Sequence, residues 1–197
     1  GWFLSTSPEM HMKRLLASGY GNMFQICHCF RKGERGQLHN PEFTMLEWYR
    51  LDADYIQIIG DTERLILHVA ASLGMVSTIR YQDRQIDLTP PWPRATVRQA
   101  FLDYAGWDPV THPDTEHFDA DLVDRVTPSL PPHRPCVLLD YPAASAAIAR
   151  LKATDPLVAE RAEVFIGGLE LANAYSELTD AAELEHRLQS EVERRRP

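Results

Sequence analysis

Two short segments whose side chains alternate between two faces place the strongest constraint on the fold. Residues 24–31 and 43–49 each repeat with a period of two, as expected for strands in a sheet. A polar loop containing Gly33 and Gly36 separates them. The side chains that share one face of the second segment are Phe43, Met45, Glu47 and Tyr49. Two strands joined by a polar loop predict an antiparallel hairpin.

The rest of the chain mixes helices with a second strand pair. Apolar spacing and end signals predict helices from Ser7-Pro8-Glu9 to Gly19 and at residues 54–73, 97–104, 143–151 and 181–196. A short buried strand is expected at 136–139, and a hairpin at 161–178 that turns at Gly167-Gly168. Residues 80–96 are expected to be poor in strand, and the acidic segment 105–135 to be a variable insertion packed on the edge. This order lacks a βαβ repeat, so it predicts one α+β domain over 1–197 with an antiparallel sheet flanked by helices.

Composition and charge narrow the class of protein. Apolar residues make up 44% and charged residues 24%, which allows a real core. The formal net charge of −8 argues against a large nucleic-acid surface, which needs a basic face. There is no signal-like start and no long apolar run, so we expect a cytoplasmic protein with reduced thiols and no membrane association. Cys27 and Cys29 have no second ligand pair at zinc-like spacing, which favours a buried strand over a metal site.

The first hairpin gathers groups that suit an anionic and aromatic ligand. Arg31 ends one strand, where a guanidinium can bind a phosphate or carboxylate through two hydrogen bonds. Phe43, Glu47 and Tyr49 bring a ring, a carboxylate and a phenol to one face, and these can hold a planar base and an amine. From spacing alone, an ordinary amphipathic hairpin with a charged tip explains the same residues.

The second hairpin brings two carboxylates to one face. A two-residue turn at Gly167-Gly168 places Phe165 opposite Glu170, and Glu163 opposite Ala172. Glu163 and Glu170 then lie diagonally on one face, where a shared cation such as Mg²⁺ would offset their repulsion. Two solvated glutamates on an edge hairpin are the alternative. Strand parity puts Asn173 and Glu177 on the face opposite Glu170, unless the chain bends near Ala174.

Three blocks of the sequence resemble one family. Residues 30–49, with Phe30-Arg31 and the run His-Asn-Pro-Glu-Phe-Thr-Met-Leu-Glu, resemble motif 2 of the lysyl subgroup of class II aminoacyl-tRNA synthetases. Residues 39–50 together with 6–16 are still more similar to the lysyl-synthetase paralogues that modify elongation factor P. Residues 165–180, Phe-Ile-Gly-Gly-Leu-Glu-Leu-Ala-Asn-Ala-Tyr-Ser-Glu-Leu-Thr-Asp, form the third block. The resemblance covers most of the chain.

The resemblance implies a role for each matching residue. Arg31 would be catalytic, because the family's motif 2 arginine holds the α-phosphate and the amino-acid carboxylate. The implied ATP-binding residues are Arg31, Lys32, Gly33, Glu34, His39, Asn40, Phe43, Glu170 and Leu171. The implied amino-acid-binding residues are Ser7, Pro8, Glu9, Glu47, Tyr49, Ala172, Asn173 and Glu177. Glu163 and Glu170 would bind Mg²⁺, so ATP and Mg²⁺ are the expected cofactors.

Position 172 separates the branches of the family. The resemblance associates glycine there with lysyl-tRNA synthetases and alanine, as in Ala172, with the elongation factor P ligases. It therefore implies (R)-β-lysine and elongation factor P as partners, no tRNA, and a homodimer of the full-length protein. The alternatives are a lysyl-tRNA synthetase and a synthetase-like module that binds without catalysing. Gly33 stands where the family usually has glutamate and Ala174 where it usually has glycine; no counterpart of motif 1 or motif 3 is found, so we expect an incomplete catalytic domain.

Overall fold

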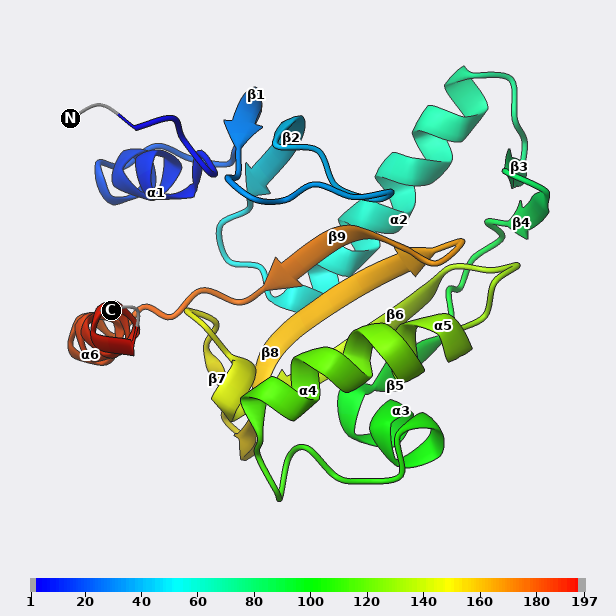
Figure 1. Ribbon diagram of the computed structural model, residues 1–197. Coiled ribbons are helices and arrows are strands. Elements are labelled where there is room, and N and C mark those ends of the chain that lie inside the picture. The colour runs from blue at the N-terminus through cyan, green and yellow to red at the C-terminus, as the bar shows by residue number, and fades with distance from the viewer. Residues whose placement is uncertain (1–2, 195–197) are drawn as a thin grey trace. The chain divides into compact units, whose positions relative to one another are not determined.

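The computed structural model describes residues 3–194 and divides into two compact units. The first unit is Gly1–Ala53 and the second is Asp54–Pro197. Figure 1 gives the labels of their helices and strands.

The first unit is a helix followed by a regular hairpin. Helix α1 (Glu9–Ala17) buries Met12, and strands β1 (Met23–Phe30) and β2 (Glu42–Tyr49) pair antiparallel. Their register is continuous over eight residue pairs, with Cys29 opposite Phe43 and no bulge. The predicted hairpin is confirmed, and each of its strands begins one residue earlier than expected.

The second unit is built on a five-stranded sheet. Its strands are β5 (Arg94–Thr96), β6 (Cys136–Pro142), β7 (Leu151–Lys152), β8 (Asp155–Ile166) and β9 (Leu169–Tyr175). Strands β6, β7 and β9 all pair antiparallel with the long strand β8. Strand β5 pairs parallel with β6. The fold is thus a mixture of helix and sheet in which four of the five strands run antiparallel, close to the predicted α+β arrangement.

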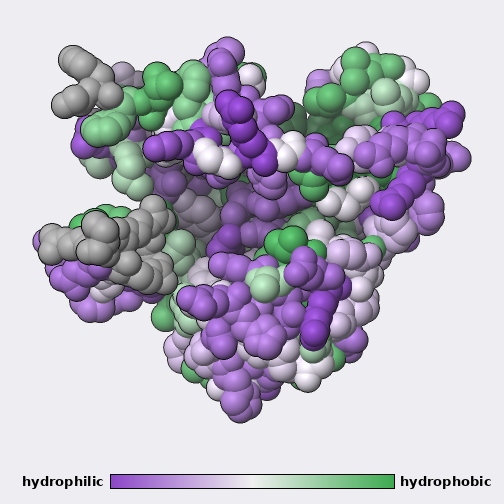
Figure 2. All heavy atoms as spheres, viewed as in Figure 1, coloured by the Kyte–Doolittle hydropathy of each residue, from purple (hydrophilic) through white to green (hydrophobic). Residues whose placement is uncertain are grey.

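Helix α2 (Tyr55–Ser72) covers one face of this sheet. It begins with a capping box, in which the Asp54 carboxylate accepts from the Gln57 backbone N–H and the Gln57 side chain accepts from that of Asp54. Ile59, fully buried, packs with Val137 and Val164 of the sheet. Apolar residues at the far end of α2 and just after it are exposed: Val69, Leu73, Met75 and Val76. Figure 2 shows green apolar atoms at the end of this helix. The helix and its predicted stop at Gly74 are confirmed.

The opposite face of the sheet is covered by the segment between β5 and β6 (Figure 1). Helices α3 (Val97–Tyr104), α4 (Thr115–Asp121) and α5 (Thr127–Ser129), with a π-helical turn (Leu122–Val126), bury Phe101, Phe118 and Val126 against Leu138 and Phe165. Residues 105–135 therefore pack on a face of the sheet, and the expectation that they sit on its edge is wrong. Their regularly placed apolar residues complete the second half of the core.

Two local predictions are also wrong. Residues 80–96 are not poor in strand, because β3 (Thr78–Tyr81) and β4 (Arg84–Asp87) form a hairpin that buries Ile86 and leads to β5. The alanine-rich segment 143–151 is not a helix; it is a 3₁₀ turn (Ala143–Ser145) followed by β7. Ala146 and Ala149 are buried against Ala159, so the small side chains serve close packing of a loop on the sheet.

The turn and the last helix follow the predictions. Gly167 and Gly168 have φ angles of +63° and +86°, the left-handed conformation that a two-residue hairpin turn requires. Helix α6 (Ala181–Arg194) occupies most of the predicted segment 181–196, whose end lies outside the described residues. Among the helices of residues 3–194, none is long and apolar enough to cross a bilayer.

Candidate functional site

The candidate residues fall into two groups, one in each unit. The first group lies on α1 and the β1–β2 hairpin, and the second on β8, β9 and the segment after β9. Each group is built from residues that the local structure brings together.

Arg31 lies directly after β1, where the strand pairing holds its backbone. Its N–H donates to the carbonyl of Pro41 at 2.9 Å. The guanidinium lies over the Phe43 ring, 5.1 Å from the ring centre, and its Nη1 is 3.9 Å from Glu34 Oε1. Its Nε donates to the Thr6 carbonyl at 3.4 Å. The Arg31 side chain is 41% exposed, so it can approach an anion while the cation–π contact holds it beside the ring.

Glu47 is the centre of the candidate amine site. Its Oε2 accepts from Ser7 Oγ at 2.9 Å, and its Oε1 accepts from Tyr49 Oη at 2.9 Å. Ser7 Oγ in turn accepts from the Glu9 backbone N–H at 3.1 Å. Three predicted residues therefore meet: the half-buried Glu47 carboxylate of β2, Tyr49 of the same strand, and Ser7, which lies just before α1. A carboxylate oriented by two hydroxyl donors suits an ammonium ligand.

Two further predicted residues flank this carboxylate. Pro8 is buried at the start of α1. The Glu9 carboxylate binds Lys13 one helical turn later at 2.7 Å. A ligand ammonium at Glu9 would therefore share that carboxylate with a lysine of the protein itself.

The loop between β1 and β2 is the open part of this unit. The side chains of Lys32, His39 and Asn40 are exposed. Gly33 has φ +88°, a left-handed conformation that disfavours other residues. This conformation explains why glycine fits where the resemblance leads one to expect glutamate. The structure brings Arg31, Phe43 and Glu34 together, while His39 and Asn40 lie in the solvent-exposed loop.

The β8–β9 hairpin carries the second group on a bulge. Phe165 pairs with Glu170 as predicted, but Val164 pairs with Ala172, so Leu171 is an extra residue. Glu163 consequently lies opposite Asn173, and the predicted pairing with Ala172 is wrong by one residue. The change of strand parity occurs at Leu171, ahead of the bend expected near Ala174.

Glu163, Glu170 and Asn173 lie on one face of the hairpin. Ala172 lies on the other face, half-buried against the apolar cluster of α2. Glu163 is 4% exposed and its Oε1 accepts from Arg161 Nη2 at 2.7 Å, whereas Glu170 is exposed. Regular alternation already places the two carboxylates on one face, and the extra residue adds the Asn173 amide to that face.

The donor set on this face fits a magnesium ion. Among the described residues, no three His, Cys, Asp or Glu side chains form a metal-binding cluster. Mg²⁺ characteristically takes one or two carboxylates and fills its other positions with water and substrate phosphates. Glu163 and Glu170, one buried and one exposed, can supply the two carboxylates.

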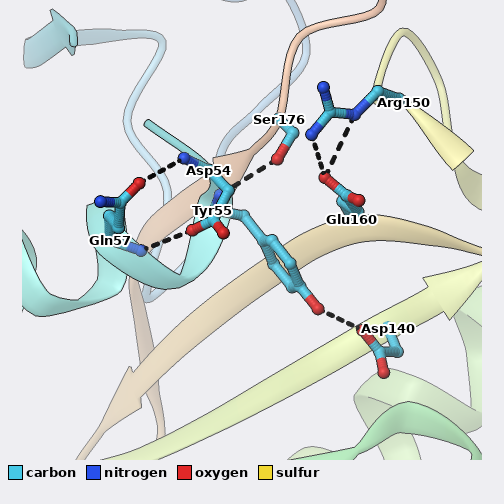
Figure 3. Close-up of polar contacts among 7 residues, drawn as sticks. All are labelled: Asp54, Tyr55, Gln57, Asp140, Arg150, Glu160 and Ser176. Carbon is cyan, nitrogen blue, oxygen red and sulfur yellow. Dashed lines mark hydrogen bonds and ion pairs between the residues drawn. The ribbon is translucent and has the colours of Figure 1, made fainter. Parts of the chain in front are cut away.

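Glu177 follows a tightly held serine. The Ser176 backbone N–H donates to the Glu160 carbonyl, and the Ser176 carbonyl accepts from Arg150 N–H, both at 2.9 Å. Ser176 Oγ accepts from the Tyr55 N–H at 3.1 Å, as Figure 3 shows. Glu177 itself is half-buried, and its backbone forms an isolated antiparallel β-bridge with Ala149. The backbone that presents Glu177 is therefore fixed from three sides.

A neighbouring polar network was not predicted from the sequence. Tyr55 Oη donates to Asp140 Oδ1 at 2.6 Å (Figure 3), and Lys152 Nζ donates to Asp140 Oδ2 at 2.7 Å. Asp140 has φ +59° at a bulge in β6. Burial and the Asp140 carboxylate raise the pKa of Tyr55 to about 12, and Asp140 also raises the pKa of Lys152. The capping signal Asp54-x-x-Gln57 was the one sequence clue that this end of α2 is held in place.

The two neighbouring cysteines behave as buried strand residues. Cys29 is fully buried, and its Sγ lies 3.8 Å from that of half-buried Cys27. Burial, followed by the effect of Cys27, raises the pKa of Cys29 to about 11. Cys29 is therefore a neutral thiol at neutral pH.

Comparison with known proteins places this chain among synthetases. Elongation factor P–(R)-β-lysine ligase of Histophilus somni strain 2336 is 38% identical over 205 residues, covering 94% of this chain and 58% of that protein. The ligase of the same name from Mannheimia succiniciproducens is 39% identical over 201 residues, covering 92% and 57%. Lysine–tRNA ligase of Dehalococcoides mccartyi strain CBDB1 is 33% identical over 213 residues, covering 98% and 43%.

The chain spans less than two thirds of the length of these relatives. A family model described as tRNA synthetases class II (D, K and N) matches residues 1–196. The chain therefore belongs to the class II tRNA synthetases of the D, K and N group.

Proposed function

We propose that this chain carries catalytic residues of an ATP-dependent ligase that activates (R)-β-lysine and transfers it to a lysine of elongation factor P. The observation that carries the proposal is the Glu47 carboxylate oriented by Ser7 and Tyr49 on the same hairpin as Arg31 and Phe43. That hairpin offers an ammonium site, a guanidinium and an aromatic ring. The names of the relatives from Histophilus somni and Mannheimia succiniciproducens support the choice of substrate and acceptor.

The reaction has two steps. A carboxylate oxygen of the amino acid attacks the α-phosphorus of ATP, and the bond to pyrophosphate breaks, which leaves an aminoacyl-adenylate. The neutral amine of the acceptor lysine then attacks the carbonyl carbon, loses a proton and releases AMP as the amide forms. Neither step requires a nucleophilic side chain of the enzyme, so positioning and charge stabilisation supply the catalysis.

Each group of residues contributes to these steps. Arg31 would bind the α-phosphate and the attacking carboxylate, and would stabilise the negative charge that grows on the phosphoryl oxygens. In the first unit, Phe43, beneath the guanidinium, would receive the adenine ring, with Lys32, Gly33, Glu34, His39 and Asn40 of the loop close to the nucleotide. In the second unit, Leu171 of the bulge would also be an ATP-binding residue. Glu163 and Glu170 would hold Mg²⁺, which neutralises charge on the phosphates when bound.

Each unit offers carboxylates for the ammonium groups of the amino acid. In the first unit these are Glu47, with Ser7 and Tyr49, and Glu9 at the start of α1. In the second unit the candidate is Glu177. Asn173, on the face of Glu163, would add an oriented polar contact. Ala172 lies on the opposite face, packed toward α2, so it would affect the choice between β-lysine and α-lysine through the packing of β9 and not as a wall of the pocket. We also propose a homodimeric, cytoplasmic protein that does not act on tRNA.

A lysyl-tRNA synthetase is the second candidate, favoured by the 33% identity to lysine–tRNA ligase. ATP–pyrophosphate exchange with α-lysine and with (R)-β-lysine separates the two, followed by transfer assays with elongation factor P and tRNA. Exchange that prefers (R)-β-lysine and transfer to elongation factor P are expected of the full-length protein. Preference for α-lysine with charging of tRNA would establish the second candidate. Exchange with neither amino acid would leave a binding module without catalysis.

A further inference from the structure

One arginine links four elements around the buried carboxylate of the second unit. Arg161 Nη2 donates to Glu163 Oε1 at 2.7 Å, and Nη1 donates to the Ser145 carbonyl at 2.8 Å. Its Nε lies 3.4 Å from Asn173 Oδ1, and its guanidinium stacks over the Tyr141 ring at 4.5 Å. The contacts come from β6, the 3₁₀ turn, β8 and β9. The guanidinium is therefore held on its edges and on one face.

The Arg161–Glu163 ion pair is more buried than a second arginine–glutamate pair of the same unit. The side chains of Arg161 and Glu163 are 20% and 6% exposed, whereas those of Arg150 and Glu160 are 47% and 15% exposed. In the latter pair, shown in Figure 3, both guanidinium donors reach the same oxygen, Glu160 Oε2. Exposed pairs contribute little, while a buried carboxylate that loses its partner is strongly destabilised or reoriented.

Two other side chains lie beside Glu163 and Arg161, those of Tyr141 and Asn173. The Tyr141 hydroxyl is fully buried and forms no hydrogen bond of normal geometry among the described residues, although burial and the nearby Glu163 raise its pKa. Asn173 is the cross-strand neighbour of Glu163 because of the bulge at Leu171. The arginine thus binds a carboxylate and an amide that the bulge has placed side by side.

We propose that Arg161 is a positioning residue that fixes the Glu163 carboxylate and the Asn173 amide on the ligand-facing side of the β8–β9 hairpin. The inference rests on the proposed function, since that function assigns these two side chains to Mg²⁺ and to the amino acid. By binding Oε1, the guanidinium sets the rotation of the carboxylate about its terminal bond. By approaching Oδ1, it turns the amide nitrogen of Asn173 away from itself.

The test measures binding of Mn²⁺–ATP by electron paramagnetic resonance and calorimetry in the full-length native polypeptide. Arg161→Met should weaken binding at least about tenfold, the usual effect of losing a residue that orients a metal ligand. Glu163→Gln should cause a similar loss, and the double variant should be no worse than Glu163→Gln alone, because Arg161 acts through Glu163. Arg161→Lys should give an intermediate loss, because it restores the charge without the planar fork.

Arg150→Met is the matched control. It removes another arginine–glutamate pair that ends on β8, but one whose partners are not candidate site residues, so Mn²⁺–ATP binding should stay within about twofold of the wild type. Any one of four results would overturn the proposal. These are wild-type affinity in Arg161→Met, additive losses in the double variant, an equal loss in Arg150→Met, and a wild type that binds no Mn²⁺–ATP. Coupled losses without pyrophosphate exchange would leave the assignment of Arg161 standing and refute the proposed ligase function.

Discussion

The two hairpins that carry the candidate residues bring their side chains to one face in different ways. The β1–β2 hairpin keeps a continuous register over its whole length and presents Phe43, Met45, Glu47 and Tyr49 on one face by simple alternation. The β8–β9 hairpin turns tightly at two glycines and then breaks its register at Leu171. A regular strand can present every second residue, whereas a bulge can combine residues of different parity. Two polar side chains of one strand whose residue numbers differ by an odd value can share a face only where the backbone is irregular.

The largest expected effect concerns the end of the regular hairpin. Arg31→Ala should lower the rate of ATP–pyrophosphate exchange at least about a thousandfold, because the guanidinium would stabilise charge in the transition state. Arg35→Ala, in the same loop and also exposed, is the control and should change the rate less than about threefold. Equal rates for Arg31→Ala and the wild type would show that the hairpin does not bind the reacting phosphate.

Alternation along β2 predicts that two glutamates of one strand differ sharply. Glu47→Gln should raise KM for the amino acid about a hundredfold, because the carboxylate oriented by Ser7 and Tyr49 loses its charge. Glu42→Gln changes a carboxylate that contacts His28 at the other end of the strand, and its KM should stay within about twofold. Steady-state exchange kinetics check both. Similar changes in the two variants would contradict the division of the hairpin into a ligand face and a solvent face.

The tight turn of the second hairpin offers a pair of glycines with different surroundings. A Cβ added at Gly167 would lie 2.8 Å from Ile86 Cδ1, whereas nothing lies within 4 Å of one added at Gly168. Both glycines have positive φ, so both changes to alanine introduce backbone strain of about 1 kcal/mol. Gly167→Ala should cost about 1–3 kcal/mol more because of the clash. Denaturant unfolding measures the free energy of unfolding of each variant. Equal losses in Gly167→Ala and Gly168→Ala would show that the Ile86 side chain moves aside without destabilising the fold.

The smallest effect concerns the network behind Glu177. Tyr55→Phe should lower the free energy of unfolding by about 1.5 kcal/mol, the value of a hydrogen bond to a carboxylate. The raised pKa of Tyr55, about 12 against 10, favours the protonated phenol in the folded state. The wild type therefore keeps this stabilisation below pH 10 and loses it as the pH rises toward 12, whereas the variant should lack that loss. Parallel stability curves for the two proteins over this range would exclude the linkage.

Prediction from sequence was most successful where tertiary packing did not override the local sequence pattern. The alternation of β1 and β2, the helix that begins after Asp54 and the Gly167-Gly168 turn all appear in the structure as expected. In the candidate site, Ser7, Glu47 and Tyr49 were chosen by resemblance, and the structure brings them together. Residues 143–151 show the limit, because alanine favours a helix locally, yet Ala146 and Ala149 are small enough to pack a loop against Ala159.

The period of each strand, the ends of the principal helices and the residue types available for binding phosphate, amine and metal can be read from the sequence. The position of the extra residue at Leu171, the pairing of Asn173 with Glu163 and the contacts of Arg161 with both depend on tertiary packing. A bulge inserts one unpaired residue into a strand, and the alternating pattern of the sequence does not by itself say where that residue lies. In this chain the apolar faces of Val164 and Ala172 both pack toward α2, and keeping them buried on either side of the bulge fixes the register that assembles the site.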